Sequence, residues 1–123
     1  MSALTGHEAS VVDGVGKQLF IGGKWRDAEG AKTFDVEDPA TGQVIAQVAD
    51  AGVSDGRAAL DAAVAVQEDW ARTPPRDRGE ILRKAWELIT QRASDLALLM
   101  TLEMGKALPE SEAEITYLSL IHI

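Results

Sequence analysis

The sequence predicts an α/β chain in which two N-terminal β-hairpins are followed by three to four α-helices. Two observations predict this order. Between residues 19 and 48, apolar and polar residues alternate and are interrupted by two glycine-containing turns, which is typical of hairpins. From residue 54 onward, apolar residues recur every three to four positions, which is typical of helices that bury one face.

The first hairpin is expected over Leu19–Arg26, where apolar and polar residues alternate on both sides of a Gly22-Gly23 pair. Two glycines permit the positive φ angles that a two-residue hairpin turn requires. The residues before this hairpin are mostly small or polar, so we expect residues 1–17 to form a flexible tail.

The second hairpin is expected over Thr33–Val48, with a five-residue turn that begins at Asp38. The Asp38 carboxylate can accept hydrogen bonds from the turn backbone, and Pro39 fixes the φ angle of the first corner. Gly42 can adopt the left-handed conformation that closes a type I turn with a bulge.

Clear breaks separate the expected helices. Ser54 is a good N-cap for the first helix, and Pro74-Pro75 end it and start the second. A third helix begins near Ser94 and is stopped by Gly105, and a fourth opens behind Pro109. The apolar stripes of the first two helices are Ala59, Ala62, Ala63, Val66 and Trp70, then Ile81, Leu82, Ala85 and Ile89, with Trp86 beside the second stripe.

The third helix differs from the others because Leu96–Leu102 is apolar around its whole circumference. Such a helix belongs inside a large protein or between subunits. We expect about four of its side chains to lack cover in this chain, at roughly 1.5–3 kcal/mol each. Two interpretations follow: the chain is part of a larger protein, or it is a self-contained helical interaction module or homodimer.

The composition excludes several classes of function. The chain holds 12 Lys and Arg against 20 Asp and Glu, a net charge of −8, so nucleic acids and anionic membranes are not expected partners. The absence of cysteine excludes disulfides, thiolate metal sites and a cysteine nucleophile within this chain. No apolar run suits a transmembrane helix and the N-terminus has no secretory pattern, so the expected compartment is the cytoplasm.

Several candidate sites have a simpler interpretation. Gly14–Lys17 has the wrong spacing for a phosphate-binding loop and is followed by Gln18 instead of Ser or Thr. His7 has no second metal ligand nearby, so a solvated surface histidine is expected. The three tryptophans are better explained as packing residues than as a platform for nucleic-acid bases; they are Trp25, Trp70 and Trp86.

Two groups of charged residues are expected to stabilise helices. The first interleaves basic and acidic residues and predicts a salt-bridged helix surface in preference to an anion site; its members are Arg76, Asp77, Arg78, Glu80, Arg83, Lys84 and Glu87. The second is Glu110, Glu112 and Glu114. Because these residues follow Pro109, negative charge in a first helical turn explains them better than an acid–base pair or a cation site.

Five segments in register resemble the N-terminal region of the aldehyde dehydrogenase family. They are Leu19–Trp25, the Asp38–Gly42 turn with its following strand, Trp70, the Pro75 and Arg78 pair before the Ile81-Leu82 helix, and Thr101–Lys106, which is similar to the family's TLE-x-GK segment. The resemblance covers about residues 19 to 117. The sequence of Glu103–Lys106 is most similar to that of the succinate-semialdehyde dehydrogenase branch.

The resemblance implies a homo-oligomeric α/β parent enzyme that uses NAD or NADP to oxidise an aldehyde, with succinate semialdehyde as the expected substrate. In this family a cysteine thiolate attacks the aldehyde, hydride passes to the nicotinamide, and a glutamate-activated water releases the acid. These groups lie downstream of the segment that the sequence covers. We therefore expect no catalytic, cofactor-binding or metal-binding residue here, no bound NAD(P), and no activity of the isolated 123 residues.

The resemblance also bears on Glu103 and on the end of the chain. Glu103 is not the family's general base; packing and hydrogen bonding is its expected role, with a place near a structural monovalent cation as the alternative. Residues 18–117 are expected to form the N-terminal part of the nucleotide-binding domain. Residues 118–123 depart from the family pattern, so we expect a non-native C-terminus after about Tyr117, in which His122 has no chemical role.

Overall fold

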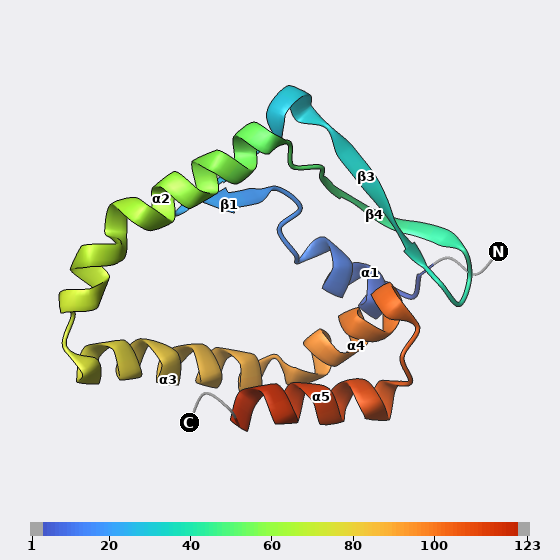
Figure 1. The fold of residues 1–123 in the computed structure, drawn as a ribbon. Coiled ribbons are helices and arrows are strands. Elements are labelled where there is room, and N and C mark those ends of the chain that lie inside the picture. Colours follow the sequence, from blue (N-terminus) through green and yellow to red (C-terminus); the bar gives the residue numbers. More distant parts are fainter. Residues whose placement is uncertain (1–3, 121–123) are drawn as a thin grey trace.

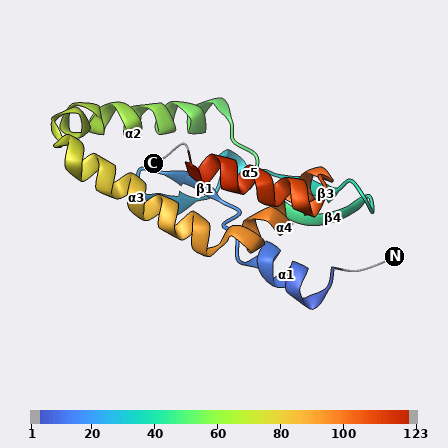
Figure 2. The same cartoon turned by 90° about the horizontal axis from the view of Figure 1, so that it is seen from below.

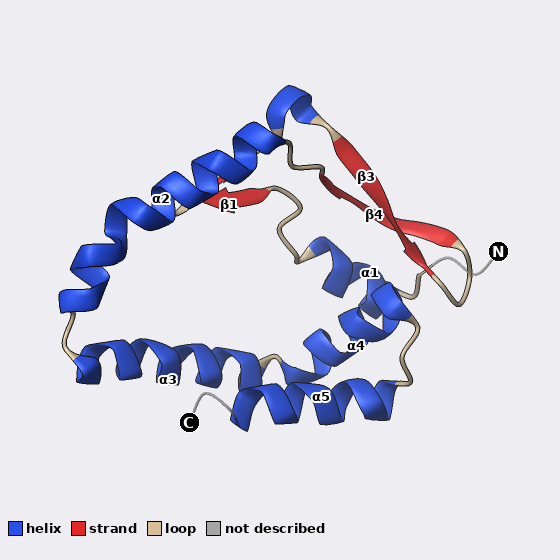
Figure 3. Cartoon of the chain, viewed as in Figure 1, coloured by secondary structure: helices blue, strands red, loops and turns tan. Residues whose placement is uncertain are grey.

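The structure is a computed structural model that describes residues 4–120, with side chains up to Tyr117. Helix α1 precedes two hairpins, and four longer helices follow them, as Figures 1 and 3 show. The elements are α1 (Gly6–Asp13), β1 (Leu19–Ile21), β2 (Lys24–Arg26), η1 (Glu29–Ala31), β3 (Thr33–Asp38), β4 (Gln43–Ala49), α2 (Val53–Arg72), α3 (Pro75–Gln91), α4 (Ala93–Met104) and α5 (Leu108–Leu120). The predicted order of two hairpins and then helices is confirmed.

Both hairpins form as their turn residues predict. Strands β1 and β2 pair antiparallel around Gly22 and Gly23, whose φ angles are 60° and 77°. Strands β3 and β4 pair antiparallel in a separate sheet, with an irregularity between Val36 and Glu37. Gly42 has the expected left-handed φ of 67°, which only glycine adopts without strain.

The structure differs from the flexible tail expected over residues 1–17, because Gly6–Asp13 form α1. Thr5 and Glu8 make a capping box: the Thr5 backbone N–H donates to Glu8 Oε2 at 2.6 Å, and the Glu8 N–H donates to Thr5 Oγ1 at 3.4 Å. Val12 on α1 is buried, and α1 packs on α4. The Thr-x-x-Glu spacing was therefore a usable helix signal in the sequence.

The helix breaks follow the prediction with one correction. Helix α2 ends at Arg72 and α3 begins at Pro75, and Gly105 ends α4 in a left-handed conformation with φ 73°. The prediction of Ser54 as an N-cap is wrong. Gly52 holds that position, and the Asp55 carboxylate accepts from the Gly52 N–H at 3.0 Å. The Ser54 hydroxyl instead donates to Glu29 Oε2 at 2.5 Å.

Helix α4 is the centre of the packing. It contacts α1, α3, α5 and β3, and Ala97 and Leu102 on it are buried. The four other large apolar side chains of the predicted all-apolar segment are half-buried, so they have more cover than expected. The cover comes partly from α1, the helix that the sequence prediction missed.

Uncovered apolar surface lies elsewhere, on the first hairpin, α2 and α3. Figures 1 and 2 show α2 and α3 as the outer sides of the chain, joined at a corner remote from α4. Their exposed large side chains include Leu60, Val64, Val66, Trp70, Ile81 and Leu88. The buried apolar residues of the described chain are only Val12, Ala28, Ala97, Leu102 and Ile115. This is a small core for a chain of this length.

The last residues of the chain are only partly described, and the helices were also compared with the dimensions of a membrane. The backbone of residues 118–120 continues α5, whereas Ile121–Ile123, with His122, lie outside the described residues. The non-native C-terminus therefore stays a prediction. No helix within residues 4–120 has the length and hydropathy to cross a membrane.

Candidate functional site

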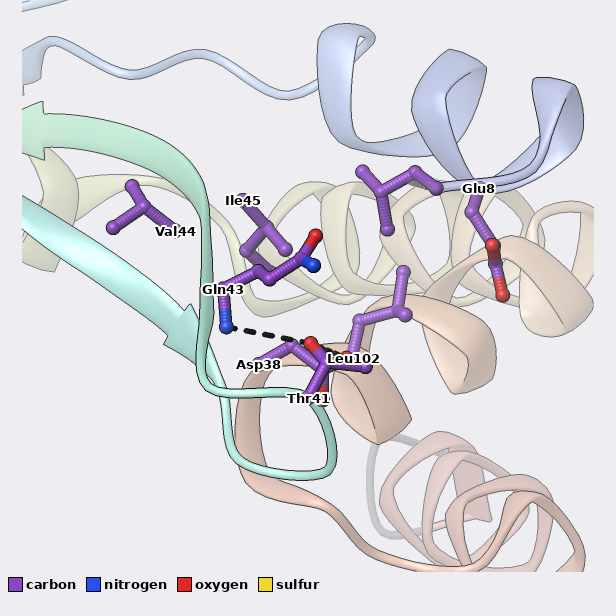
Figure 4. A pocket seen from close by; sticks show the side chains of 8 residues that line it. Glu8, Asp38, Thr41, Gln43, Val44, Ile45 and Leu102 are labelled. Atoms are coloured by element: carbon purple, nitrogen blue, oxygen red, sulfur yellow. Dashed lines mark hydrogen bonds between the residues drawn. The ribbon is translucent and has the colours of Figure 1, made fainter. Parts of the chain in front are cut away.

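One candidate site is a cleft of about 410 Å³ between the turn of the second hairpin, α1 and α4. Figure 4 shows Asp38, Thr41 and Gln43 from the hairpin on one side, with Glu8 of α1 and Leu102 of α4 facing them. The turn residues reach this position because β3 packs against α4. The site therefore brings together three segments that are distant in the sequence.

The two carboxylates of the cleft already accept hydrogen bonds from the turn and from the helix cap. Asp38 Oδ1 accepts from the Ala40 N–H at 2.9 Å, and Asp38 Oδ2 accepts from the Thr41 hydroxyl at 2.8 Å. The Glu8 carboxylate accepts from the Thr5 N–H. Hydrogen bonding to the backbone and to the hydroxyl of Thr5 lowers the pKa of Glu8. These bonds stabilise the turn and α1 and leave few acceptors for a ligand, so the cleft is structural.

A second polar cluster joins the first hairpin to the start of α2. Asp55 is 1% exposed and accepts from Arg26 Nη2 at 2.5 Å, the Glu29 N–H at 2.9 Å and the Gly52 N–H at 3.0 Å. The two backbone donors, helped by the Arg26 guanidinium, lower the pKa of the Asp55 carboxyl. A buried carboxylate with three donors is fully satisfied. Asp55 therefore links the first hairpin, η1 and the start of α2.

The segment that resembles TLE-x-GK connects α4 to α5. The hydroxyls of Thr101 and Ser111 are hydrogen-bonded at 3.1 Å, and Ser111 is fully buried. Lys106 Nζ pairs with Glu114 of α5. Glu103 is exposed and makes no hydrogen bond or ion pair within the described chain, so the packing and hydrogen-bonding role expected for Glu103 stays a prediction for the complete enzyme.

The predicted salt-bridged helix surface is confirmed for three residues of its group, Glu80, Arg83 and Glu87. Arg83 pairs with Glu80 at 2.5 Å and with Glu87 one turn further on. These pairs raise the Arg83 pKa, and the hydrogen bond from Arg83 lowers the Glu80 pKa. Arg76, the first basic residue of the group, has no ion pair in the part of α3 that the structure describes.

The histidine and the acidic residues that the sequence offered as candidates do not come together in one site. His7 lies 3.9 Å from Asp95 of α4, a surface pair of two exposed side chains. Glu110 lies in the first turn of α5, as expected. Glu114 forms an ion pair with Lys106. Within residues 4–117, no three His, Asp or Glu side chains gather at a metal-binding distance.

Comparison with known proteins identifies the class of protein in which this arrangement of two hairpins and helices occurs. The sequence profile of the aldehyde dehydrogenase family matches residues 25–121. The chain belongs to the aldehyde dehydrogenase family.

Particular relatives narrow the similarity. The chain is 55% identical over 74 residues to the succinate-semialdehyde dehydrogenase of Paenarthrobacter nicotinovorans, which covers 60% of this chain and 16% of that enzyme. It is 43% identical over 98 residues to the human mitochondrial succinate-semialdehyde dehydrogenase, covering 80% of this chain and 18% of the relative.

Solved structures agree with the family. The NAD⁺ complex of betaine aldehyde dehydrogenase from Staphylococcus aureus superposes with a TM-score of 0.90 at 26% identity, over 94% of this chain and 23% of that one. The succinate-semialdehyde dehydrogenase of Burkholderia pseudomallei gives 0.80 at 38% identity, over 83% and 21%. The chain thus spans less than a quarter of the length of these relatives.

Proposed function

We propose that this chain is the N-terminal segment of an NAD(P)-dependent aldehyde dehydrogenase that oxidises succinate semialdehyde to the acid. The observation that carries the proposal is the 55% identity to the Paenarthrobacter succinate-semialdehyde dehydrogenase. A glutarate-semialdehyde dehydrogenase of Pseudomonas putida, 40% identical over 101 residues, makes glutarate semialdehyde the second candidate substrate.

Within such an enzyme the segment has a structural role. Its buried carboxylates, Asp38 and Asp55, hold turns and helix starts and are occupied by backbone and side-chain donors. The chain contains no cysteine, so the thiolate that attacks the aldehyde must come from another part of the enzyme. Nucleotide binding and the general base belong to that part as well, and the isolated chain is inactive.

The competing function is a self-contained interaction module. The small number of buried apolar residues and the exposed apolar side chains of α2 and α3 favour a segment of a larger protein. Sedimentation and thermal melting separate the two possibilities. A module gives a defined oligomer with a sharply cooperative melt, whereas a segment gives a loose state that aggregates readily and unfolds in a broad transition.

A chimeric enzyme tests the proposal. Residues 19–117 replace the matching segment of the Paenarthrobacter enzyme, and NAD(P)H formation is followed with succinate semialdehyde. We expect a rate within about tenfold of the parent enzyme, a difference of about 1.4 kcal/mol in the barrier. The same exchange with the Burkholderia segment controls for the junctions. An inactive chimera beside an active control contradicts the proposal.

The substrate needs a separate experiment. The gene is sequenced beyond the codon for residue 117. The complete enzyme that it encodes is then assayed with succinate semialdehyde, glutarate semialdehyde and betaine aldehyde. The proposal expects the highest kcat/KM for succinate semialdehyde, because enzymes discriminate substrates by that ratio. A higher kcat/KM for another aldehyde overturns the substrate assignment and leaves the family unchanged.

A further inference from the structure

An apolar groove separates the first hairpin from α2. Its volume is about 390 Å³, and it is lined without any charged residue by Phe20, Ile21, Gly22, Gly23, Ala59, Ala62, Ala63 and Val66. We call it the hairpin–α2 groove. Five of the eight lining residues are glycine or alanine, so the groove has room for large apolar side chains of a partner.

The groove continues into wider uncovered apolar surface. Phe20 is 61% exposed and contacts Trp25, which is 56% exposed, with the ring centroids 5.0 Å apart and the ring planes tilted by 51°. Along α2, Val53, Leu60 and Val64 repeat at helical spacing beside the groove and are exposed as well. Helix α2 is therefore apolar over about half of its circumference and yet contacts the chain mainly through β1. Contiguous apolar surface of this kind marks an interaction site.

The length of the relatives indicates what covers this surface. Less than a quarter of each matched enzyme has a counterpart in this chain, although the fold of the segment is kept with a TM-score of 0.90. The remaining three-quarters of such an enzyme is a partner large enough to bury the groove and the α2 surface. A second copy of this chain is the poorer occupant, because association would bring together two chains of net charge −8.

We propose that the hairpin–α2 groove binds the remaining part of an aldehyde dehydrogenase polypeptide even when that part is a separate chain, so that the two pieces assemble without a covalent link. This inference rests on the proposed function. The physical reason is that burial of apolar side chains drives association in the same way that it drives folding. A covalent link only raises the effective concentration of the two pieces.

Co-expression tests the inference. The 123-residue chain is produced together with a tagged Paenarthrobacter succinate-semialdehyde dehydrogenase that lacks the matching segment. We expect the two polypeptides to purify together in equal amounts and to form NAD(P)H with succinate semialdehyde. Each polypeptide alone should be inactive.

Two alanines on α2 provide a matched pair of variants. Ala63 is exposed and lines the groove. Ala65 is also exposed but lies on another face of α2, away from the groove. Both substitutions introduce an aspartate into the same helix. Ala63→Asp should reduce the co-purified amount about tenfold or more, because a charge would be desolvated in an apolar site. Ala65→Asp should leave the amount unchanged.

The covalent chimera separates failure of this inference from failure of the proposed function. If the chimera is inactive, the proposed function is wrong. If the chimera is active but the separate pieces do not purify together, or if Ala63→Asp and Ala65→Asp behave alike, the inference is wrong. A homodimer of the 123-residue chain that Ala63→Asp dissociates, with no binding of the remainder, overturns it in favour of self-association.

Discussion

A Cβ atom placed on Gly105 would lie 2.9 Å from Cγ of Pro39. The residue that ends α4 therefore touches the turn of the second hairpin. Both belong to segments that resemble family motifs, the Asp38–Gly42 turn and Thr101–Lys106. In the structure these two motifs touch each other, and the contact holds the second hairpin against α4 beside the buried Leu102.

Gly105→Ala should destabilise the chain. Gly105 has a φ of 73°, and alanine would combine the strain of a left-handed conformation with the close approach of Pro39. We expect a loss of about 1–3 kcal/mol, measured by urea unfolding followed by circular dichroism. Gly56→Ala is the control, because a Cβ there meets nothing within 4 Å. That control should stabilise by about 0.4–1 kcal/mol; equal effects of both changes would contradict the contact.

Asp55→Asn should weaken the hydrogen bonds that link the first hairpin to α2. An amide cannot accept from Arg26, Glu29 and Gly52 together, because one of its two polar atoms is a donor. We expect a lower urea midpoint and a change in the fluorescence of Trp25, which neighbours Arg26. Asp61→Asn, on the exposed part of α2, should change neither. A normal midpoint for Asp55→Asn would show that the cluster contributes nothing.

The contribution of Asp55 should depend on pH in one direction. Its pKa is lowered below the ordinary value of 3.8, first by the backbone donors of Glu29 and Gly52. A lowered pKa stabilises the fold where the carboxyl is ionised in both states, and this stabilisation is lost as the pH falls below 3.8 toward the folded-state pKa. The difference in urea midpoint between the wild-type chain and Asp55→Asn should therefore be constant above about pH 5 and shrink toward pH 3. A difference that grows on acidification would refute the assignment.

Leu60→Ala should behave differently in two contexts. Leu60 is 63% exposed in this chain, so the isolated chain should lose less than about 0.5 kcal/mol. In the active chimera, where the α2 surface is expected to be covered, the same change should lower the temperature of thermal inactivation. Leu102→Ala, a change at a 7% exposed side chain, should cost about 2–5 kcal/mol in the isolated chain. An unchanged chimera with Leu60→Ala would argue against burial of α2.

Much of the local structure could be predicted because it depends on backbone sterics. Gly22, Gly23, Gly42 and Gly105 all adopt the positive φ angles that their patterns predicted. The Pro74-Pro75 break falls where expected, since proline suits only a first helical turn. Helix α1 was missed although its Thr5 and Glu8 spacing was present, because a short segment of small and polar residues is helical only when capped and packed.

The sequence by itself determined the family, the two hairpins and the helix breaks, since each is encoded by residues close together in the chain. The tertiary structure alone decided what Asp55 does. Its partners Arg26 and Glu29 lie 29 and 26 positions away, and no local pattern links them. Packing also decided that α1 covers α4 and that α2 remains open, because burial depends on which elements meet in space.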